Sequence, residues 1–544
     1  MRARYLAAGD RGLVVELGNA ANTRKIDPRT NARVRALDEA LRASPFPGYE
    51  EAIPAYRSLL VFYEPRAITF HGASEHIREL VKSLDVTQLS PTPVKEVPTV
   101  YDGDDLDDVA RRAGVTRTDV IRQHSERDYL VYMVGFIPGF AYMGMTDAKL
   151  ALPRKATPRT RVPAGSVGIA MGQTGIYPAA APGGWHLLGR AEHRALFDPT
   201  ASPPSFFVPG DRVRFVPVDA LEGVDPEGAP ETESPAPTMT AALEVEDGGL
   251  LTTVQDLGRF GFQRHGVPVA GAMDPRALSE ANELVANEPN AAGLECTVAG
   301  PTLRCLSATV AAIAGADLGA LVERSDLGHW HPPLGSSFRL RPGNVLRFEG
   351  RRAGARAYIA FAGGIDVPMV VGSRSTYLMT GFGGYRGRAL IAGDALSLLP
   401  SSGAVQAGRG RRLAPASSSP EAPTLRFIWG PQDDHFTPRA RLALESSVYV
   451  VGAASDRMGY RLEGPKLEHR DVVSQQIISD GNALGSIQVP PDELPIVMLA
   501  DRATTGGYPK IATVVSADVA RLAQLMPGER LRFKAVSLEE VQGR

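Results

Sequence analysis

Cysteine is nearly absent from this sequence: Cys296 and Cys305 are the two cysteines in a chain of 544 residues. No disulfide framework is therefore expected, and the reducing cytoplasm is the natural location. The spacing of the pair fits neither a C-x-x-C redox motif nor a zinc site. We interpret both cysteines as buried free thiols.

Long hydrophobic runs and an excess of charge of either sign are missing as well. No window of eighteen uncharged apolar residues occurs, and residues 1–6 lack the apolar stretch of a signal peptide, so we expect no membrane span. The formal net charge of -2 gives no general attraction to nucleic acid or to a membrane surface. The hydrophobic content of 43% is ordinary for a soluble globular protein, and the length indicates three or four domains.

The motifs of familiar one-motif enzymes are absent too. No G-x-x-x-x-G-K-[ST] occurs, which excludes a P-loop nucleotide site, and no H-E-x-x-H, G-x-S-x-G or EF-hand loop is found. A Met-Lys-Met turn for covalent biotin attachment is also missing, so any biotin would be carried by another chain. We assign no metal ligands, and a site would have to be assembled from scattered residues.

The most informative feature that is present is a duplication. Gly165-Ser166-Val167, Gly183-Gly184-Trp185 and residues 209–215 are matched, in the same order, by Gly485-Ser486-Ile487, Gly506-Gly507-Tyr508 and residues 527–533. The Gly-Ser pair and the Pro-Gly turn are 44 residues apart in the first copy and 42 in the second. Ordered matches at near-equal spacing indicate two related domains, and the cleft between such domains is a common place for a site.

Each copy ends in a Pro-Gly turn followed by alternating Val or Leu, Arg and Phe, which is typical of a half-buried strand. Residues 342–348 give this phrase a third time, so we expect two barrel-like lobes in the second half, ending near residues 400 and 536. Residues 219–238 are acidic, rich in proline and without large apolar side chains, as in a linker. The predicted fold class is mainly β with α+β. The predicted units are an N-terminal α+β domain (1–90), a barrel (91–218), the linker (219–238), a first lobe (239–400), a loop (401–423) and a second barrel lobe (424–544).

Local patterns predict several individual elements. Strands are expected at residues 13–17, 58–63 and 129–134 from their apolar runs. Apolar residues at helical spacing predict helices at 30–41, 74–84, 106–113 and 116–125. Ser74 and Thr118 are the expected caps of two of these helices, and Asp274 is expected to cap a helix that runs through Ala277, Ala281 and Leu284.

Isolated histidines are interpreted conservatively. His329 and His331 would lie on one face of a strand, but two prolines follow and no third ligand is evident, which favours an exposed turn over a metal site. His265 lies beside a glycine and could act as a general base, although a structural role is the favoured interpretation.

Three polar clusters stand above this background. In the first, Arg154, Arg159 and Arg161 are separated by prolines and followed by Gln173, Tyr177 and Gly183-Gly184-Trp185. Stiffly held guanidinium groups suit carboxylate or phosphate binding, and glycine pairs expose N–H groups that can bind an anionic oxygen. A salt-bridged barrel rim is the alternative interpretation.

The second and third clusters lie in the other half of the chain. In residues 252–261, Asp256 and Arg259 flank a glycine. In residues 501–510, Asp501, Arg502 and two threonines precede Gly506-Gly507-Tyr508. Burying this many polar groups costs free energy, so we expect them to have a function. Residue chemistry alone therefore favours the third cluster as the functional segment.

These phrases resemble the Kip-type family, whose members are described as the B and C subunits of 5-oxoprolinase and, in older usage, as allophanate hydrolase subunits. Residues 5–218 resemble the B subunit, through residues 53–59, 135–140 and 162–185. Residues 240–536 resemble the C subunit, through residues 254–259, 362–368, 372–376 and 501–508. The resemblance covers nearly the whole chain, with the two subunits fused through the acidic linker.

The resemblance implies tandem cyclophilin-like β-barrels, and a relationship to the carboxyltransferase domain of urea carboxylase. It also implies ATP-dependent hydrolysis of 5-oxo-L-proline to L-glutamate together with a separate third subunit, because no part of this chain resembles that subunit. ATP, with the Mg²⁺ that would accompany it, is the expected cofactor, and its site is not assigned. The alternatives are a carboxyltransferase served by a biotinylated carrier, or a non-enzymatic regulator of a sensor kinase. The assembly into homo-oligomers is left open.

Under the leading hypothesis, Asp501 is predicted as a base or proton relay, and Arg374 with Arg502 as anion clamps. Asp501→Asn should then abolish turnover without unfolding. The predicted catalytic residues are Asp501, Arg502, Arg374 and Asp256, and the predicted substrate-binding residues are Arg154, Arg159, Gln173, Tyr177, Gly184, Trp185, Gln255, Arg259, Thr505, Gly507 and Tyr508.

Overall fold

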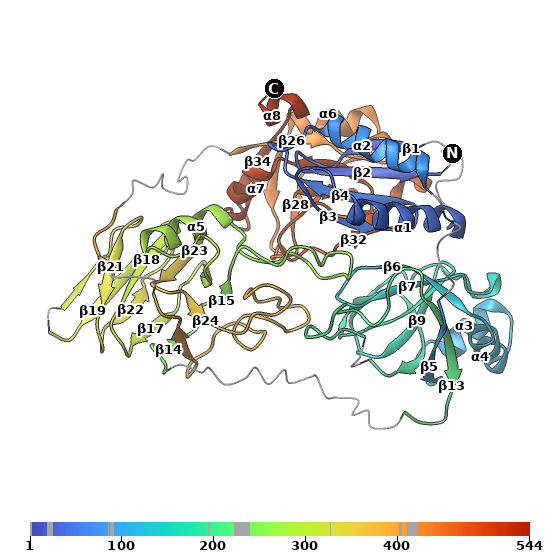
Figure 1. Ribbon diagram of the computed structural model, residues 1–544, viewed down its shortest axis with the longest axis horizontal. Helices are drawn as coiled ribbons and strands as arrows, with labels where there is room; N and C mark the ends of the chain where they lie inside the picture. The colour runs from blue at the N-terminus through green and yellow to red at the C-terminus, as the bar shows by residue number, and fades with distance from the viewer. Residues whose placement is uncertain are drawn as a thin grey trace.

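The computed structural model describes residues 3–18, 26–84, 86, 92–193, 196–221, 240–326, 328–401, 405–410 and 422–543. The predicted linker (219–238) and the predicted loop (401–423) lie largely outside the described residues. The described chain is mainly β, with two closed barrels, as predicted. Figure 1 shows the N-terminal domain beside the C-terminal barrel, although the two are at opposite ends of the sequence.

The N-terminal domain is a four-stranded antiparallel sheet covered by two helices. Its strands follow the order β1 (Ala3–Ala7), β2 (Gly12–Leu17), β4 (Ser58–Tyr63) and β3 (Tyr49–Pro54), with α1 (Pro28–Ala43) and α2 (Phe70–Ser83) packed on one face. Alternate residues of β4, such as Leu59 and Val61, face the helices. Leu60 faces Ala483 of the other half of the chain. The sheet is therefore buried on both faces, which explains why β4 reads as a continuous apolar run.

Two of the predicted helix caps are wrong. Thr69 caps α2 by accepting a 3.0 Å hydrogen bond from Gly72 N, and Ser74 is buried inside the helix. Thr116, not Thr118, caps α4 (Arg117–Ser125) through a capping box with Asp119, while α3 (Leu106–Ala113) has the predicted bounds. In both cases an earlier threonine already had the extended backbone that a cap requires, so the helix starts there.

The first closed barrel contains seven strands in the circular order β5-β12-β9-β10-β7-β6-β13. β13 runs parallel to β5, and every other neighbouring pair is antiparallel. A separate two-stranded ribbon, β8 (Arg159–Val162) with β11 (Ala181–Gly183), lies outside the barrel sheet. The barrel strands are β5 (Val94–Val100), β6 (Tyr129–Val134), β7 (Ala141–Gly144), β9 (Ser166–Ala170), β10 (Gln173–Ile176), β12 (His186–Ala191) and β13 (Arg212–Pro217).

The second barrel repeats this topology strand for strand. Its circular order is β26-β33-β30-β31-β28-β27-β34, with β34 parallel to β26, and it too has a separate ribbon, β29 (Asp480–Gly481) with β32 (Thr505–Gly506). The duplicated Pro-Gly phrases lead into β13 and β34, where Val213, Phe215, Leu531 and Phe533 are buried. The remaining elements are β26 (Thr424–Trp429), β27 (Val448–Val451), β28 (Gly459–Glu463), β30 (Ser486–Gln488), β31 (Ile496–Met498), β33 (Lys510–Val514), β34 (Arg530–Ala535), α6 (Pro438–Ser446), α7 (Ser516–Ala523) and α8 (Leu538–Gln542).

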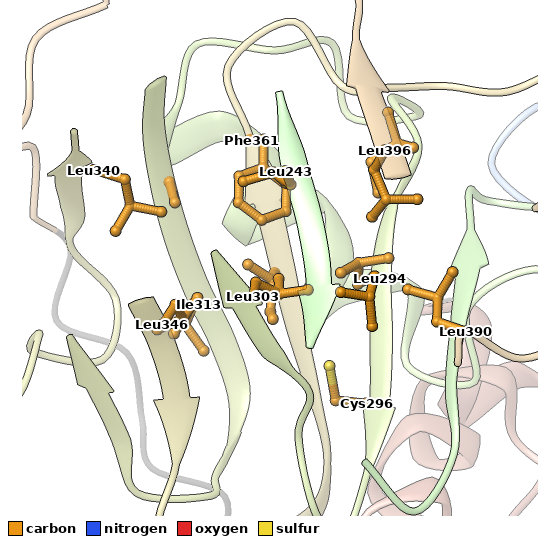
Figure 2. Packing of buried hydrophobic residues seen from close by; sticks show 14 of the residues in the cluster. Leu243, Leu294, Cys296, Leu303, Ile313, Leu340, Leu346, Phe361, Leu390 and Leu396 are labelled. Carbon is orange, nitrogen blue, oxygen red and sulfur yellow. The ribbon is translucent and has the colours of Figure 1, made fainter. Parts of the chain in front are cut away.

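The lobe between the barrels, residues 240–400, is not a closed barrel, and that expectation is wrong. Its strands form two open sheets, in the orders β20-β19-β22-β17-β14-β25-β24 and β15-β16-β23-β18-β21. Figure 2 shows their shared core, which includes Leu243, Leu294 and Phe361. The third Pro-Gly turn leads into β22. A turn followed by a half-buried strand occurs in open sheets as well as in closed barrels, so this pattern did not specify a barrel.

The elements of this lobe have the following bounds: β14 (Leu243–Asp247), β15 (Thr252–Gln255), α5 (Pro275–Leu284), β16 (Gly293–Thr297), β17 (Thr302–Cys305), β18 (Thr309–Asp317), β19 (Ala320–Arg324), β20 (Gly328–Trp330), β21 (Ser337–Leu340), β22 (Val345–Phe348), β23 (Ala353–Phe361), β24 (Ile365–Asp366) and β25 (Ala395–Leu398). Asp274 caps α5 as predicted, accepting from Ala277 N at 3.1 Å. Cys296 and Cys305 are buried free thiols in the core, also as predicted. No helix in the described part of the chain has the length and apolar character needed to cross a membrane.

Candidate functional site

The two barrels meet at a cavity of about 260 Å³, and the duplicated glycine phrases line it from both sides. Gly183, Gly184 and Trp185 come from the first ribbon, and Gly506, Gly507 and Tyr508 come from the second. The barrels approach closely here: a Cβ added to Gly135 would lie 2.2 Å from Thr505 Oγ1. A side chain at position 135 would collide with Thr505, so glycine is required there. The segment 135–140, which begins with this glycine, therefore lies at the contact between the barrels.

Arg154 supplies the positive charge of the cavity. Its side chain is exposed and forms no hydrogen bond or ion pair with any described residue. It reaches across toward the second barrel, since a Cβ on Gly507 would be 3.8 Å from Arg154 Nη2. The N–H groups of Gly184 and Gly507 likewise donate to no acceptor within the described ranges. A free guanidinium beside free amide N–H groups is an arrangement that binds an anionic oxygen.

Aromatic rings of the first barrel line the cavity as well. Phe140 packs edge-to-face on Trp185 with centroids 5.4 Å apart, and Tyr142 and Tyr177 pack against Phe140. Tyr177 Oη accepts a hydrogen bond from the Trp185 backbone, and burial raises the pKa values of Tyr142 and Tyr177. These hydroxyls therefore stay protonated near neutral pH, and these rings offer a ligand apolar contact and neutral polar groups.

Ion clusters hold the two ribbons from behind. Asp105 binds Arg159 Nη1 at 2.8 Å, Lys155 Nζ at 2.6 Å and Leu187 N at 2.8 Å. Burial acts to raise the pKa of Asp105, but the hydrogen bonds from Arg159 and Lys155 outweigh it and lower the pKa to about 2. Arg159 is thus committed to Asp105 and does not line the cavity.

The second ribbon has a corresponding cluster, in which the charged residue on the ribbon is an acid, Asp480, instead of an arginine. Lys510 Nζ binds Asp480, and Gln432 donates to Asp480 Oδ2 at 3.0 Å and accepts from Lys510 N at 3.1 Å. Burial raises the pKa of Asp480. Asp480 is paired in register with Gly506, as Arg159 is with Gly183, so equivalent ribbon positions carry opposite charges.

Asp501 and Arg502 lie behind the second ribbon, outside the inter-barrel cavity. Asp501 is buried and accepts from Arg457 Nε at 3.0 Å and from Arg457 Nη2 at 2.9 Å. Arg457 also binds Glu295 and Gly271 O, so this network joins the second barrel to the preceding lobe. Arg502 lines a different cavity, between the N-terminal domain and the second barrel.

Another cluster, away from the lining of the inter-barrel cavity, contains the buried Asp256, Arg259 and Gln255 and the half-buried Arg374. Asp256 accepts from Arg374 N at 2.7 Å and from Ser373 Oγ at 2.6 Å, and Arg374 Nε donates to Val367 O. Gln255 Nε2 donates to Thr376 O at 3.2 Å. Arg259 is fully buried over the Phe382 ring, and burial lowers its pKa to about 10. Gln173, in the first barrel, accepts from Tyr56 Oη at 2.6 Å.

The structure therefore brings together one subset of the predicted site residues. Sequence reasoning missed others: the phrase 135–140 is marked in the sequence only by its family resemblance, and the polar residues near the second Gly-Ser pair give no signal of their own. Predicted residues that line the cavity are Arg154, Tyr177, Gly184, Trp185, Thr505, Gly507 and Tyr508; unpredicted ones include Phe136, Phe140, Tyr142, Ser479, Asn482 and Gln488.

The histidines of the described chain do not form a metal site. The described residues contain no group of three or more His, Cys, Asp or Glu side chains placed to hold a metal ion. His331 is half exposed and contacts Ala320 O through Nδ1 at 3.0 Å. His265 is mostly buried, which lowers its pKa to about 4.

Comparison with known proteins identifies both halves. Residues 3–207 match the family model "Carboxyltransferase domain, subdomain C and D", and residues 265–535 match "Carboxyltransferase domain, subdomain A and B". The chain is 36% identical to the C subunit of 5-oxoprolinase of Escherichia coli (strain K12), over 55% of this chain and 92% of that protein. It is 36% identical to the B subunit of 5-oxoprolinase of Bacillus subtilis (strain 168), over 38% of this chain and 90% of that protein.

Two further similarities are to part of a longer enzyme and to a solved structure that spans both halves. The chain is 32% identical to the urea amidolyase of Lachancea kluyveri, over 55% of this chain but 17% of that protein. A crystal structure of TTHA0988 superposes with a TM-score of 0.83 at 37% identity, covering 96% of this chain and 99% of that one. The chain therefore belongs to the carboxyltransferase-domain family of the 5-oxoprolinase B and C subunits, with a B-like half and a C-like half fused in one polypeptide.

Proposed function

We propose that this chain is the fused B–C component of an ATP-dependent 5-oxoprolinase that opens 5-oxo-L-proline to L-glutamate with a separate third subunit. The names of the subunit relatives support the reaction class. The observation that carries the proposal is Arg154, a cation without a partner among the described residues, in a small cavity between the two halves. A small cyclic amide that bears one carboxylate matches both the charge and the size of this cavity.

The residues of the cavity suit the binding of that substrate. The guanidinium of Arg154 would hold the carboxylate, and the Phe140 and Trp185 rings would contact the carbons of the lactam. A lactam is a poor electrophile, and phosphorylation of its oxygen is the activation that ATP supplies. The free N–H groups of Gly184 and Gly507 are suited to stabilise negative charge that develops on that oxygen. A cytoplasmic location and accompanying Mg²⁺ belong to this proposal.

The test is reconstitution. The purified chain is assayed for glutamate release from 5-oxoproline and ATP, alone and with the third subunit of a 5-oxoprolinase. We expect near-inactivity alone and turnover in the complete mixture. Failure of the complete mixture to release glutamate, while the chain binds the third subunit, would count against the reaction.

Carboxyl transfer is the second candidate, and the description of the family models favours it. In this case a biotinylated carrier protein would present carboxybiotin to the inter-barrel cavity, and no ATP would be consumed on the chain. Calorimetric titration with a carboxybiotin analogue and with 5-oxoproline discriminates the two. Binding of the analogue alone supports transfer, and binding of 5-oxoproline alone supports the lactamase reaction.

A further inference from the structure

A second cavity, of about 200 Å³, lies where three parts of the molecule meet. The turn between β1 and β2 (residues 8–12) forms one wall, the segment 257–275 forms another, and residues of the second barrel and α7 form the third. Much of the lining is small and apolar: Ala8, Gly9, Gly12, Ala270, Ala272, Ala483, Ala500 and Ala520. These small side chains leave an apolar space, open to solvent, of a kind that binds small ligands.

Arg502 is the buried cation of this cavity, and Asp10 and Glu51 are buried carboxylates of the same lining. Its side chain is 3% exposed, and it donates to three neutral acceptors: Asn482 O at 3.0 Å, Gln263 Oε1 at 2.9 Å and Leu499 O at 3.5 Å. No carboxylate of the described chain lies within 4.0 Å of it. A guanidinium has five N–H groups, so at least two are left for another acceptor. Burial lowers the pKa of Arg502 to about 10, which leaves it charged at neutral pH.

The other charged groups around the cavity are already engaged. Arg11 pairs with Glu50 and Glu64, and Asp10 accepts from Ser516 N at 2.9 Å at the start of α7. Both carboxylate oxygens of Glu51 accept from Gln263, at 2.8 and 3.1 Å, so Gln263 stands between Glu51 and Arg502. Arg502 is therefore the one lining cation, among the residues described, that has no carboxylate partner.

We propose that this cavity binds a short-chain aliphatic monocarboxylate, with its carboxylate on Arg502 and its alkyl chain among the alanines. The nearest counter-charge of Arg502 is Glu51, which reaches it only through Gln263, so a bound carboxylate would give Arg502 the direct ion pair that it lacks, through paired hydrogen bonds. The cavity volume of about 200 Å³ leaves room for a short alkyl chain, of roughly four to eight carbons.

This site is separate from the inter-barrel cavity but shares a wall with it. Ala483 and Arg502 face the new cavity, whereas their neighbours Asn482 and Ala503 face the inter-barrel cavity. Asn482 also donates to Ala503 O at 3.1 Å and accepts from Gln488 at 2.9 Å, so the wall is one hydrogen-bonded unit. A ligand bound to Arg502 would therefore contact the backbone segment that continues, through Ala503, into the second glycine ribbon.

The experiment is calorimetric titration of the full chain with the series from butanoate to octanoate, with hexan-1-ol as the uncharged comparison. We expect one site per chain, a preferred chain length within the series, and weaker binding of the alcohol. Arg502→Met should weaken the preferred acid by about 10-fold or more, because a charge-assisted hydrogen bond is lost, and should leave the alcohol unchanged. Equal weakening of acid and alcohol would overturn the assignment of Arg502.

A second pair of variants guards against a folding defect in Arg502→Met. Ala520→Leu fills the cavity from α7 and should abolish binding, whereas Ala517→Leu on the exposed face of the same helix should not. Hydrogen exchange on the bound chain locates the site. Protection at residues 8–12 and 499–502 supports the proposal, and protection confined to 181–185 and 505–508 would mean that the acid occupies the inter-barrel cavity instead. Absence of binding across the series would also overturn it.

Discussion

At the scale of single residues, the arginines differ by what they already bind. Arg159 is held by Asp105 and Arg457 by Asp501 and Glu295, whereas Arg154 has no partner among the described residues. A guanidinium that is already paired stabilises the fold, and an unpaired one at a cavity is available to a ligand. The same residue type therefore has two roles, which the partner distances separate.

Arg154→Met should weaken binding of 5-oxoproline by about 10- to 100-fold, because one charge-assisted contact to the carboxylate is lost. The melting temperature should stay within about 1 °C of the original, since Arg154 forms no ion pair with the described residues. Calorimetric titration and a thermal scan measure the two quantities. Arg161→Met, an exposed arginine of the same segment that does not line the cavity, is the matched control. Equal affinity in the two variants would contradict the role of Arg154.

Asp501→Asn should lower the free energy of unfolding by about 3–5 kcal/mol, because it leaves the buried Arg457 without one of its two carboxylates. This expectation differs from the sequence-based one, in which turnover is lost without unfolding. Denaturant unfolding measures it, with the exposed Glu445→Gln as control. A variant with unchanged stability and no turnover would favour the proton-relay role instead.

The sequence could identify the residue types of the site but not their partners. The arginine and glycine phrases around Arg154 and Gly507 are visible because they recur or cluster in the sequence. Asp105 and Arg457 give no such signal, since each acts on a residue more than 40 positions away. Which arginine is paired depends on these distant contacts.

At the scale of elements, the two glycine ribbons occupy equivalent positions in their barrels. They also leave a similar amount of space for a Cβ atom at each of their two glycines. At the first glycine of each pair a Cβ would collide, 2.3 Å from Tyr177 Oη at Gly183 and 2.4 Å from Gln488 Nε2 at Gly506. At the second glycine, Gly184 or Gly507, the nearest atoms are 3.3 Å away or more. The first glycine thus permits packing of the ribbon, and the second keeps the cavity open.

Gly507→Ala should keep the fold but weaken 5-oxoproline binding by about 10-fold, because the new methyl group would lie 3.3 Å from Ser479 Oγ and 3.8 Å from Arg154 Nη2, both in the cavity lining. Gly506→Ala should instead destabilise the protein by about 1–3 kcal/mol through the clash with Gln488. Thermal unfolding and calorimetric titration of both variants test the contrast. If Gly507→Ala were the less stable of the two, the geometry of the ribbon would be wrong.

The docking of α4 on the first barrel should make stability depend on pH. His124 is fully buried, bonded to Tyr101 Oη at 2.7 Å and to Thr174 Oγ1 at 2.8 Å, and burial, with the charge of Arg127, lowers its pKa to about 3. The unfolded chain binds this proton near pH 6.5, so between about pH 6.5 and 3 it binds more protons than the folded chain. Stability should therefore fall as the pH falls through this window.

Denaturant unfolding at pH 7 and pH 4.5 measures this effect. The contribution of His124 is expected to fall by about 2–3 kcal/mol between these values. His124→Gln should be less stable at pH 7, with a difference from the original protein that narrows at pH 4.5. The exposed His71→Gln should follow the original protein at both values. A constant difference for His124→Gln would show that its protonation does not matter.

At the scale of the whole molecule, the two halves are joined by contacts as well as by the chain. Leu60 of β4 packs on Gly481 of β29, Glu51 binds Gln263, and Arg264 pairs with Asp38 at 2.7 Å. Figure 1 shows the N-terminal domain beside the second barrel, and Asn31 and Tyr56 of that domain also hydrogen-bond to Tyr132 and Gln173 of the first barrel. The B-like half thus contacts the C-like half through both of its domains, and the inter-barrel cavity exists only when both halves are present.

Residues 1–221 and 240–544, expressed as two chains, should therefore associate in a one-to-one complex. The subunit relatives that match each half are separate chains, which supports this expectation. Leu60→Asp in the first fragment should separate them, because it places a charge on the buried interface, whereas Leu250→Asp at an exposed position should not. Size-exclusion chromatography with light scattering measures the mass. Separate elution of the unaltered fragments would contradict the interface.

The sequence by itself determined the duplication, the main strands and helices and the family, because these depend on local periodicity and on phrases that recur at fixed spacing. The open sandwich of residues 240–400 was not determined in this way, since one turn-strand phrase fits both an open and a closed sheet. Only the tertiary structure decided that Arg154 faces Gly507 and that Arg502 faces a different cavity. Those placements depend on contacts between residues hundreds of positions apart, which no local pattern records.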